Sequence, residues 1–383
     1  MLLPVTKGNE MKIDAHYYAL LAFCRACGFK KESAHKVAYA SQFVDDARIN
    51  HIVIAGNPGR DLIQCDNIDN QPSFFNMATC HSYTRMKTFN IEAMINNTCA
   101  FHFVPGCRGP NFAKKLRCSE ESSVITDILR EALEEDDLIK LGIVLHAYAD
   151  TFSHQGFSGI LSKVNDIKEC KTLSRLPWTW SDKFARVFKW SVKDKFDKLL
   201  DSAIPAYGHG QAMEYPDLPF LRWSYEYDYS DQFSTAYKSS GEIDNMARYE
   251  RAFQKIKGYL EDYLSRHREY RDGGISFQKF DILFDTLLLE KTDRERVKNW
   301  QKTIVAQGLF AEEDPACAYD ENGWLREAFA NFEEEKFNQR KVDRAVTTAN
   351  FSASNWYKYY LAVKWYKERF FYYCSQTGLE IPR

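Results

Sequence analysis

The chain has 383 residues, of which 45% are hydrophobic and 27% are charged, and this balance excludes a disordered or fibrous protein. The formal net charge is −2, so the basic surface typical of proteins that bind long nucleic acids is not expected. Aromatic residues reach 15%, and most of them are expected to fill a core.

The first half of the chain predicts helices interrupted by a small ribbon. Apolar residues recur at helical spacing through 14–48, which indicates two helices, with Gly28 as the C-cap of the first and Ser33 as a candidate N-cap of the second. The runs HIVIAG at 51–56 and NTCAFHFVPG at 97–106 are expected to pair as a short β ribbon. Further predicted elements are helices over 120–135, 137–154 and 180–200 and a long aromatic-rich loop over 201–233.

After residue 240 the pattern is helical almost throughout, with candidate helices at 241–269, 276–290, 292–308, 322–340 and 353–374. No Pro/Gly/Ser-rich linker separates the two halves. We therefore expect an all-α fold, mainly α with a short β ribbon. Residues 1–235 would form a metal-binding helical core and 236–383 a C-terminal helical layer packed on it, as one continuous domain.

The opening residues lack an apolar run of signal-peptide length, and no stretch of about 18 apolar residues could span a membrane. A cytoplasmic location is therefore expected, with effector-type export left open. The ten cysteines of so large a chain are expected to be reduced. Cys24 and Cys27 form a CxxC inside a helical pattern, without the second pair that a zinc ribbon needs.

The sharpest motif is LHAYADTFSH, which places His146, Asp150 and His154 at intervals of four residues. On a helix these side chains share one stripe, with a rise of about 6 Å between neighbours. The sequence just before them is apolar, so polar groups on this stripe need partners, and a metal ion is one candidate. Three hydrogen-bonded side chains in a helical core are the alternative.

Other candidate ligands are scattered over the first 220 residues. Asp14 and His16 open the first helix, Asp45 and Asp46 close the second, and His102 stands in an apolar run. His209 lies between two glycines, with two carboxylates shortly after it. A set of His and carboxylate ligands suits zinc, and also manganese or iron. The full candidate set is Asp14, His16, Asp45, Asp46, His102, His146, Asp150, His154, His209, Glu214 and Asp217.

This ordered set resembles the zinc-dependent phospholipase C and single-strand-specific nuclease superfamily over roughly residues 12–220. The phrases FVDDA, FHFVPG, LHAYADTFSH and GHG-x5-PD also look like a group of uncharacterised bacterial proteins related to that superfamily. The resemblance implies an all-α core, two or three zinc ions and phosphodiester hydrolysis. Asp45 or Asp46 would then orient the attacking hydroxide, and Arg60 and Arg108, on Gly/Pro loops, would neutralise substrate phosphate.

The chain departs from the superfamily pattern at three places. It has no N-terminal Trp, so Asp14 would have to replace that ligand or the third ion would be missing. His154 follows Asp150 by four residues, where the superfamily has six. The superfamily ends its ligand set with His-x-x-x-Glu, but here Glu214 and Asp217 follow His209 by five and eight residues. These differences favour an alternative: a non-catalytic metal-stabilised protein or a binding module.

The expected substrate is a small phosphodiester or a phospholipid head group, because long nucleic acid would need a basic groove. Aromatic residues of the 215–229 loop could form an apolar wall beside the metals, or they could only pack the loop. The aromatic helix predicted over 355–374 carries four cations, a pattern found in helices that lie on membranes. A core helix is the alternative for that segment.

Overall fold

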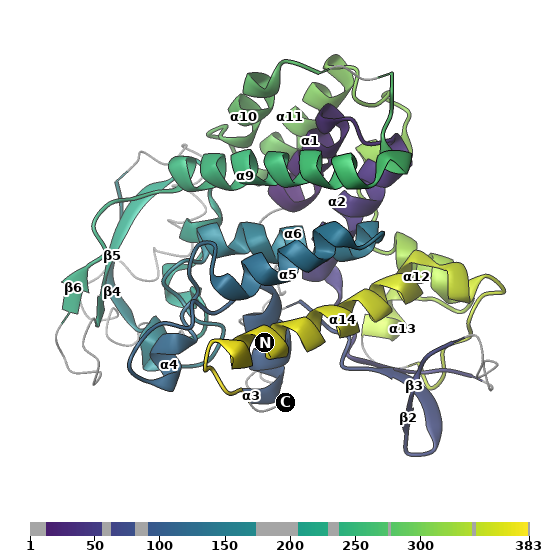
Figure 1. Ribbon diagram of the computed structural model, residues 1–383, viewed down its shortest axis with the longest axis horizontal. Helices are drawn as coiled ribbons and strands as arrows, with labels where there is room; N and C mark the ends of the chain where they lie inside the picture. The colour runs from purple at the N-terminus through teal and green to yellow at the C-terminus, as the bar shows by residue number, and fades with distance from the viewer. Residues whose placement is uncertain are drawn as a thin grey trace, which may run out of the picture.

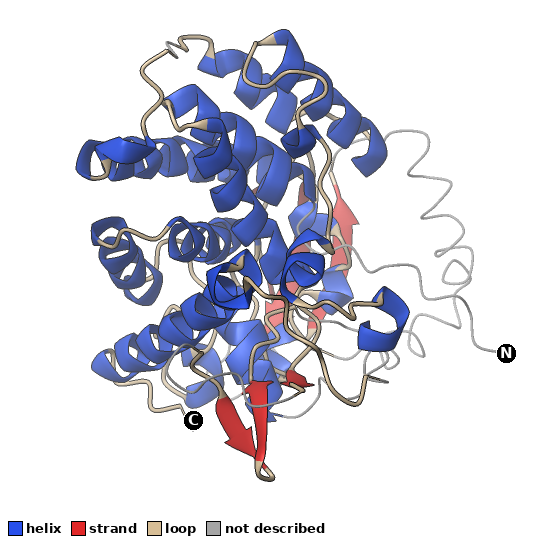
Figure 2. Ribbon diagram, turned by 90° about the vertical axis from the view of Figure 1, so that its right-hand side faces the viewer, coloured by secondary structure: helices blue, strands red, loops and turns tan. Residues whose placement is uncertain are grey.

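The computed structural model describes residues 13–55, 63–80, 91–173, 206–228, 237–274, 277–338 and 342–381. Within these residues the protein is mainly α-helical with small antiparallel sheets, which confirms the expected fold class (Figures 1 and 2). The helix predicted over 180–200 lies outside the described residues.

Among its described residues, the N-terminal half contributes two six-residue π-helices and six α-helices. The π-helices are η1 (Asp14–Ala19) and η3 (Met94–Cys99). The α-helices are α1 (Leu20–Cys27), α2 (Lys31–Asp46), α3 (Ile91–Ala93), α4 (Phe112–Lys115), α5 (Ser123–Glu134) and α6 (Leu138–Ser153). As expected, α1 ends at Gly28, which has a φ of 104°.

The C-terminal half adds six more described helices. They are α9 (Asn245–Arg266), α10 (Phe280–Leu287), α11 (Asp293–Ala306), α12 (Gly323–Ala328), α13 (Glu334–Asn338) and α14 (Asn355–Gln376). The prediction of one helix over 322–340 was wrong. The chain leaves helical geometry at Phe329, which bridges to Thr347, and the Ala330 amide donates to the Val346 carbonyl. Extended pairing at 329–330 therefore divides α12 from α13.

α6 is the central helix. It packs against α2, α5, α9 and α14, and Figure 1 shows α9 and α14 running on opposite sides of the α5–α6 pair. Close approach of α2 and α6 depends on Gly142, because a Cβ there would lie 2.4 Å from the Val37 carbonyl oxygen. Gly142 lies one turn before His146, so this contact brings the end of α2 beside the polar stripe of α6.

Two small sheets flank the helices (Figure 2). One is formed by β1 (His51–Val53), β2 (Asp66–Ile68) and β3 (Gln71–Phe75), in the order β1-β3-β2. The other is formed by β4 (Ile167–Thr172), β5 (Arg222–Asp228), β6 (Tyr237–Ser239) and β7 (Ile243–Asp244). In the second sheet β5 pairs with the other three strands, all antiparallel.

Three local predictions were wrong. The run 51–56 does start a strand, but its partner is β3, because 97–106 begins as the end of η3 and continues as helix to Phe101. A short buried apolar run cannot be assigned to strand or helix by periodicity alone. Part of the predicted loop 201–233 forms β5, and α2 begins at Lys31 with Lys30, not Ser33, at its N-cap.

One hydrophobic core extends from Ala15 to Leu379 and so includes side chains from both halves of the chain. The aromatic residues of α14, such as Trp356, Tyr360 and Tyr366, are buried in it. The face that would enter a lipid interface is therefore covered by protein. Among the described residues, no helix combines the length and apolar character needed to cross a membrane.

Candidate metal centre

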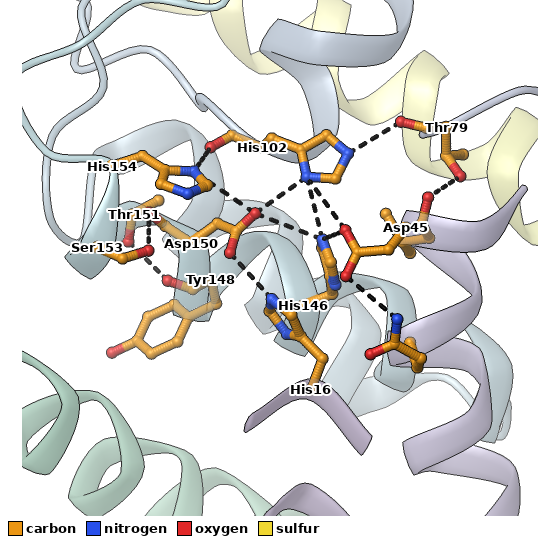
Figure 3. A network of polar contacts seen from close by, with 12 residues as sticks. His16, Asp45, Thr79, His102, His146, Tyr148, Asp150, Thr151, Ser153 and His154 are labelled. Atoms are coloured by element: carbon orange, nitrogen blue, oxygen red, sulfur yellow. Dashed lines mark hydrogen bonds and ion pairs between the residues drawn. The ribbon is translucent and has the colours of Figure 1, made fainter. Parts of the chain in front are cut away.

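The polar stripe on α6 lies at the centre of a buried cluster of histidines and aspartates (Figure 3). Asp150 is its hub. Its Oδ1 lies 3.1 Å from His16 Nε2, and its Oδ2 lies 3.1 Å from His102 Nδ1, 3.4 Å from His146 Nε2 and 3.6 Å from His154 Nδ1. Each of these five side chains is at most 2% exposed. One carboxylate therefore contacts four histidines out of reach of solvent.

Asp45 completes this part of the cluster from the last turn of α2. Its Oδ1 lies 3.8 Å from His102 Nδ1 and 3.7 Å from His146 Nε2. His146 and His102 bring these two nitrogens to 3.3 Å from each other. The His16 ring stacks on the His146 ring with a centroid distance of 3.9 Å. Two groups of three of these side chains have a spacing that could hold an ion: Asp45, His102 and His146, and His16, His146 and Asp150.

A neighbouring group consists of His154, His209 and Asp217. Asp217 Oδ1 lies 3.1 Å from His154 Nε2, and its Oδ2 lies 3.5 Å from His209 Nε2. The second nitrogen of each histidine is fixed by a carbonyl: His154 Nδ1 is 2.7 Å from the His102 oxygen and His209 Nδ1 is 2.7 Å from the Met213 oxygen. His154 therefore presents Nε2 to this group while its Nδ1 side faces Asp150.

The backbone around the cluster fixes the orientation of His102. Its Nε2 lies 3.0 Å from the Thr79 carbonyl, which can only accept, so Nε2 carries the proton and Nδ1 presents its lone pair to Asp45, His146 and Asp150. Thr79 is held in turn by its hydroxyl, 2.7 Å from the Val44 carbonyl and 2.9 Å from the Tyr359 hydroxyl. A carbonyl that orients a histidine in this way is typical of metal sites.

The two π-helices lie next to ligands. His16 is inside η1, and His102 follows the end of η3 by three residues. π-Helical turns are rare and frequently mark functional sites. Here they set the direction of two of the four histidines around Asp150.

The electrostatics keep the carboxylate ionised and two of the histidines neutral. Burial lowers the pKa of His146 to about 3, with a further contribution from His16, and burial also lowers the pKa of His209. Although burial opposes its charge, Asp150 has a pKa well below the usual range because His154, His146 and His16 surround it. Metal ligands need this combination of ionised carboxylate and neutral imidazole.

His154 has the opposite tendency. Burial alone would lower its pKa, but the Asp150 and Asp217 carboxylates outweigh burial and raise the pKa to about 9. In the absence of an ion, a protonated His154 therefore balances part of the negative charge on the two aspartates. A bound cation could take over that role.

The structure thus brings together eight of the eleven ligands expected from the sequence: His16, Asp45, His102, His146, Asp150, His154, His209 and Asp217. Three lie outside these groups. Asp14 forms a buried ion pair with Arg296, Asp46 accepts a hydrogen bond from the Tyr319 hydroxyl at 2.8 Å, and Glu214 immediately precedes the turn that carries Asp217. Asp14 is therefore not placed to replace the missing N-terminal ligand.

The two predicted phosphate-binding arginines are not part of the described site. Arg108 is exposed on the loop after His102, and Arg60 lies outside the described residues. The aromatic residues Phe220, Trp223 and Tyr225 belong to a second hydrophobic cluster that packs the 206–228 segment. Phe103, in the same cluster, stacks on His154 with a centroid distance of 4.7 Å. These aromatics therefore support the ligands and pack the segment together.

Asp46 borders a pocket on the outer side of the last turn of α2. Phe43, Met77, Trp356 and Tyr359 also line this pocket. Tyr359 links the pocket to the cluster through Thr79. A fourth group, Asp136, His267 and Glu269, also has metal-ligand spacing, but its two carboxylates are exposed and it lies between α5 and α6 and just after the end of α9.

The fold and the cluster define a mainly α-helical protein with buried groups of histidine and aspartate that could hold metal ions. The chain belongs to a family of unknown function, DUF6765, which it matches over residues 11–374. No curated protein and no solved structure matches the chain. Any assignment of activity therefore depends on the chemistry of the site.

Proposed function

We propose that the protein is a metal-dependent hydrolase that holds two divalent ions, zinc in the first instance, and acts on small phosphodiesters or phospholipid head groups. The observation that carries the proposal is the position of Asp150, whose two carboxylate oxygens contact His16, His102, His146 and His154. Together with Asp150, the grouped side chains are five histidines and two further aspartates, which match the nitrogen and oxygen ligands that zinc, manganese and iron prefer.

One buried ligand atom supports a fit to metal. Asp217 Oδ2 has no hydrogen-bond partner among the described residues. Leaving such an atom buried and unpaired costs on the order of 1–3 kcal/mol. A cation bound within the two groups would stabilise the surrounding lone pairs. We assign the first ion to Asp45, His102, His146 and Asp150, with His16 adjacent, and the second to His154, His209 and Asp217.

The chemistry that such ions supply when bound is the activation of water and the neutralisation of phosphate charge. The chain provides the orientation. The Thr79 carbonyl fixes the proton of His102 on Nε2, and the His102 and Met213 carbonyls fix the rings of His154 and His209. Of the two predicted catalytic carboxylates, Asp45 is the one that faces the ligands and could hold the proton of the attacking water.

Burial favours a second candidate function, a metal centre that only stabilises the fold. The eight grouped ligands are at most 7% exposed, with Asp45 the most accessible. A structural site needs no access for substrate, whereas a hydrolase does. The small net charge of −2 argues in both cases against long nucleic acid as a ligand.

Metal analysis by mass spectrometry, after purification without chelator, tests the metal centre. We expect two equivalents of zinc in the wild type and fewer in Asp150→Ala. Hydrolysis of bis-p-nitrophenyl phosphate and of phosphatidylcholine, with zinc or manganese, then separates the two candidates. Activity in the wild type that is lost in Asp150→Ala supports the hydrolase. A wild type that holds its metal and hydrolyses neither substrate leaves the structural centre, and a metal-free wild type contradicts both.

A further inference from the structure

Tyr249 on α9 carries a buried hydroxyl that the proposed ligand set does not use. Its side chain is 3% exposed, and its hydroxyl has no hydrogen-bond partner among the described residues. An unpaired buried hydroxyl destabilises a fold, so its presence calls for an explanation. Tyr148 and Tyr263, two other buried tyrosines of the same helical layer, donate to Glu121 and to the Glu135 carbonyl.

The neighbours of Tyr249 on α9 contact the segments that carry His154 and Asp217. Asn245 lies one turn earlier on the same face, and its amide donates to the carbonyls of Tyr215 at 2.7 Å and Leu218 at 2.8 Å. It therefore holds both ends of the turn that carries Asp217. Arg248 donates to the Ser153 carbonyl, the residue before His154. The start of α9 thus spans both elements that form the second ion group.

The charges around the hydroxyl agree with this position. Burial chiefly raises the pKa of Tyr249, and the carboxylates of Asp217, Asp14 and Asp150 raise it further, against a smaller opposing effect of Arg296. The phenol therefore remains protonated at neutral pH and can donate a hydrogen bond. Two of the three carboxylates that act on it are proposed metal ligands.

The nearby cation, Arg296, is not available to donate a hydrogen bond to a substrate, because its nitrogens already have acceptors. Arg296 directs Nε and Nη2 to Asp14, at 2.6 and 3.1 Å, and donates Nη1 to the Lys291 carbonyl. The grouped histidines and aspartates offer lone pairs to an ion. Tyr249 differs from these groups. Its hydroxyl is a neutral hydrogen-bond donor that has no acceptor among the described residues.

We propose that the Tyr249 hydroxyl donates a hydrogen bond to an oxygen of the phosphate group of the substrate, and so makes the C-terminal half part of the binding site. This inference rests on the proposed function. A tetrahedral oxyanion held at the second ion has oxygens that need donors, and the side chains grouped around the ion offer none. Tyr249 is thus a substrate-binding residue supplied by α9.

The test compares Tyr249→Phe with wild type and with Tyr263→Phe, all as zinc-loaded full-length chains. Metal content is measured first, and the dissociation constant of inorganic phosphate is then measured by titration calorimetry. A hydrogen bond to a charged oxygen corresponds to roughly 10- to 100-fold in affinity, so Tyr249→Phe is expected to bind phosphate that much more weakly with unchanged metal content. Tyr263→Phe, which loses a hydrogen bond remote from the ligands, should bind phosphate like the wild type.

Because Phe keeps the ring and removes only an unpaired hydroxyl, Tyr249→Phe is expected to fold and to be at least as stable as wild type. Equal phosphate affinity in Tyr249→Phe and wild type would overturn the proposal and leave a purely structural tyrosine. A metal-loaded wild type that binds no phosphate would overturn it as well. A wild type that binds no metal is a separate result, since it contradicts the proposed function itself.

Discussion

Asp14 and Arg296 form a fully buried, two-pronged ion pair, with Arg296 Nε 2.6 Å from Asp14 Oδ2 and Nη2 3.1 Å from Oδ1. The pair joins η1, which carries His16, to α11 in the C-terminal half. Two residues that are 282 positions apart in the chain therefore couple the position of a proposed ligand to α11. The ion pair also explains why Asp14 does not lie among the grouped ligands.

Substitution of Asp14 by Asn should lower stability without removing metal. Breaking one partner of a buried ion pair leaves an uncompensated charge, here on Arg296, and costs about 3–5 kcal/mol. Urea unfolding at pH 7 measures this loss. Asp293, which contacts Arg296 at 3.3 Å and is partly exposed, supplies the control, since Asp293→Asn should cost about 1 kcal/mol or less. Loss of one zinc equivalent in folded Asp14→Asn would show that Asp14 is a ligand after all.

Asp150→Ala should reduce the stabilisation by zinc, because it removes a ligand of the first ion only. A ligand that binds only the folded state adds about 2.7 kcal/mol at 100 times its dissociation constant. Without Asp150, four histidines lose their shared carboxylate, and the affinity for the first ion falls. Thermal unfolding with zinc and with chelator measures the difference. Asp127→Ala, which removes only an exposed partner of Arg130, should keep the zinc-dependent shift. If zinc raised the unfolding temperature of Asp150→Ala as much as that of the wild type, Asp150 would not be a metal ligand.

The part of the site that could be predicted from sequence is the part that helical geometry fixes. His146, Asp150 and His154 lie on one stripe because α6 is regular over Leu138–Ser153. The same geometry could have corrected two candidates. Neighbouring positions on a helix diverge by about 100°, so Asp45 and Asp46 cannot face the same ion. Asp14 and His16, two residues apart, also point in different directions.

The remaining features of the site depend on contacts between residues that are far apart in the sequence. No local sequence pattern indicates such contacts. The Thr79 carbonyl that orients His102 is a backbone atom, and no residue type marks it. Tyr249, and Arg296 that pairs with Asp14, lie on helices that begin after residue 240. Their sequences read as ordinary amphipathic helices. Eight of the nine histidines lie before residue 210, which indicated the part of the chain that carries the grouped side chains but not the later helices that pack around them.

A further prediction concerns the buried side chain of Lys367. It is buried on α14 and donates to the Asn76 carbonyl and to the side-chain oxygens of Asn76 and Asn97. Burial lowers its pKa to about 7, whereas an unfolded Lys titrates near 10.4. Between these values the unfolded chain binds the proton that the folded chain has lost. The stability contributed by Lys367 therefore rises with pH in this window, by about 1 kcal/mol per pH unit.

Unfolding of wild type and Lys367→Met at pH 6, 7, 8 and 9 measures this effect. Below pH 7 the lysine is charged in both states, so the difference between the two proteins should be constant. Above pH 7 the wild type should gain stability relative to Lys367→Met. Parallel stability curves across all four values would show that the carbonyl and amide oxygens around Lys367 keep it charged.

The last prediction distinguishes a protein that binds two metal ions from one that binds a single ion. Among the described residues, His209 is grouped with His154 and Asp217 and not with Asp45 or His146. His209→Ala should therefore lower the zinc content by about one equivalent and leave the first ion in place. Glu214→Gln is the matched control, because Glu214 lies in the same segment and outside every grouped set. It should retain both equivalents.

A second measurement identifies which ion remains. Cobalt substituted for zinc gives absorption bands that depend on its ligands, so His209→Ala should keep the bands of the first ion and lose those of the second. In the double variant His209→Ala/Asp150→Ala both sets of bands should disappear. If His209→Ala retains two equivalents of metal, His209 is a loop histidine fixed by the Met213 carbonyl, and the second group must be redrawn without it. If it loses all metal, the eight ligands act as one cooperative centre and the assignment of two separate ions is wrong.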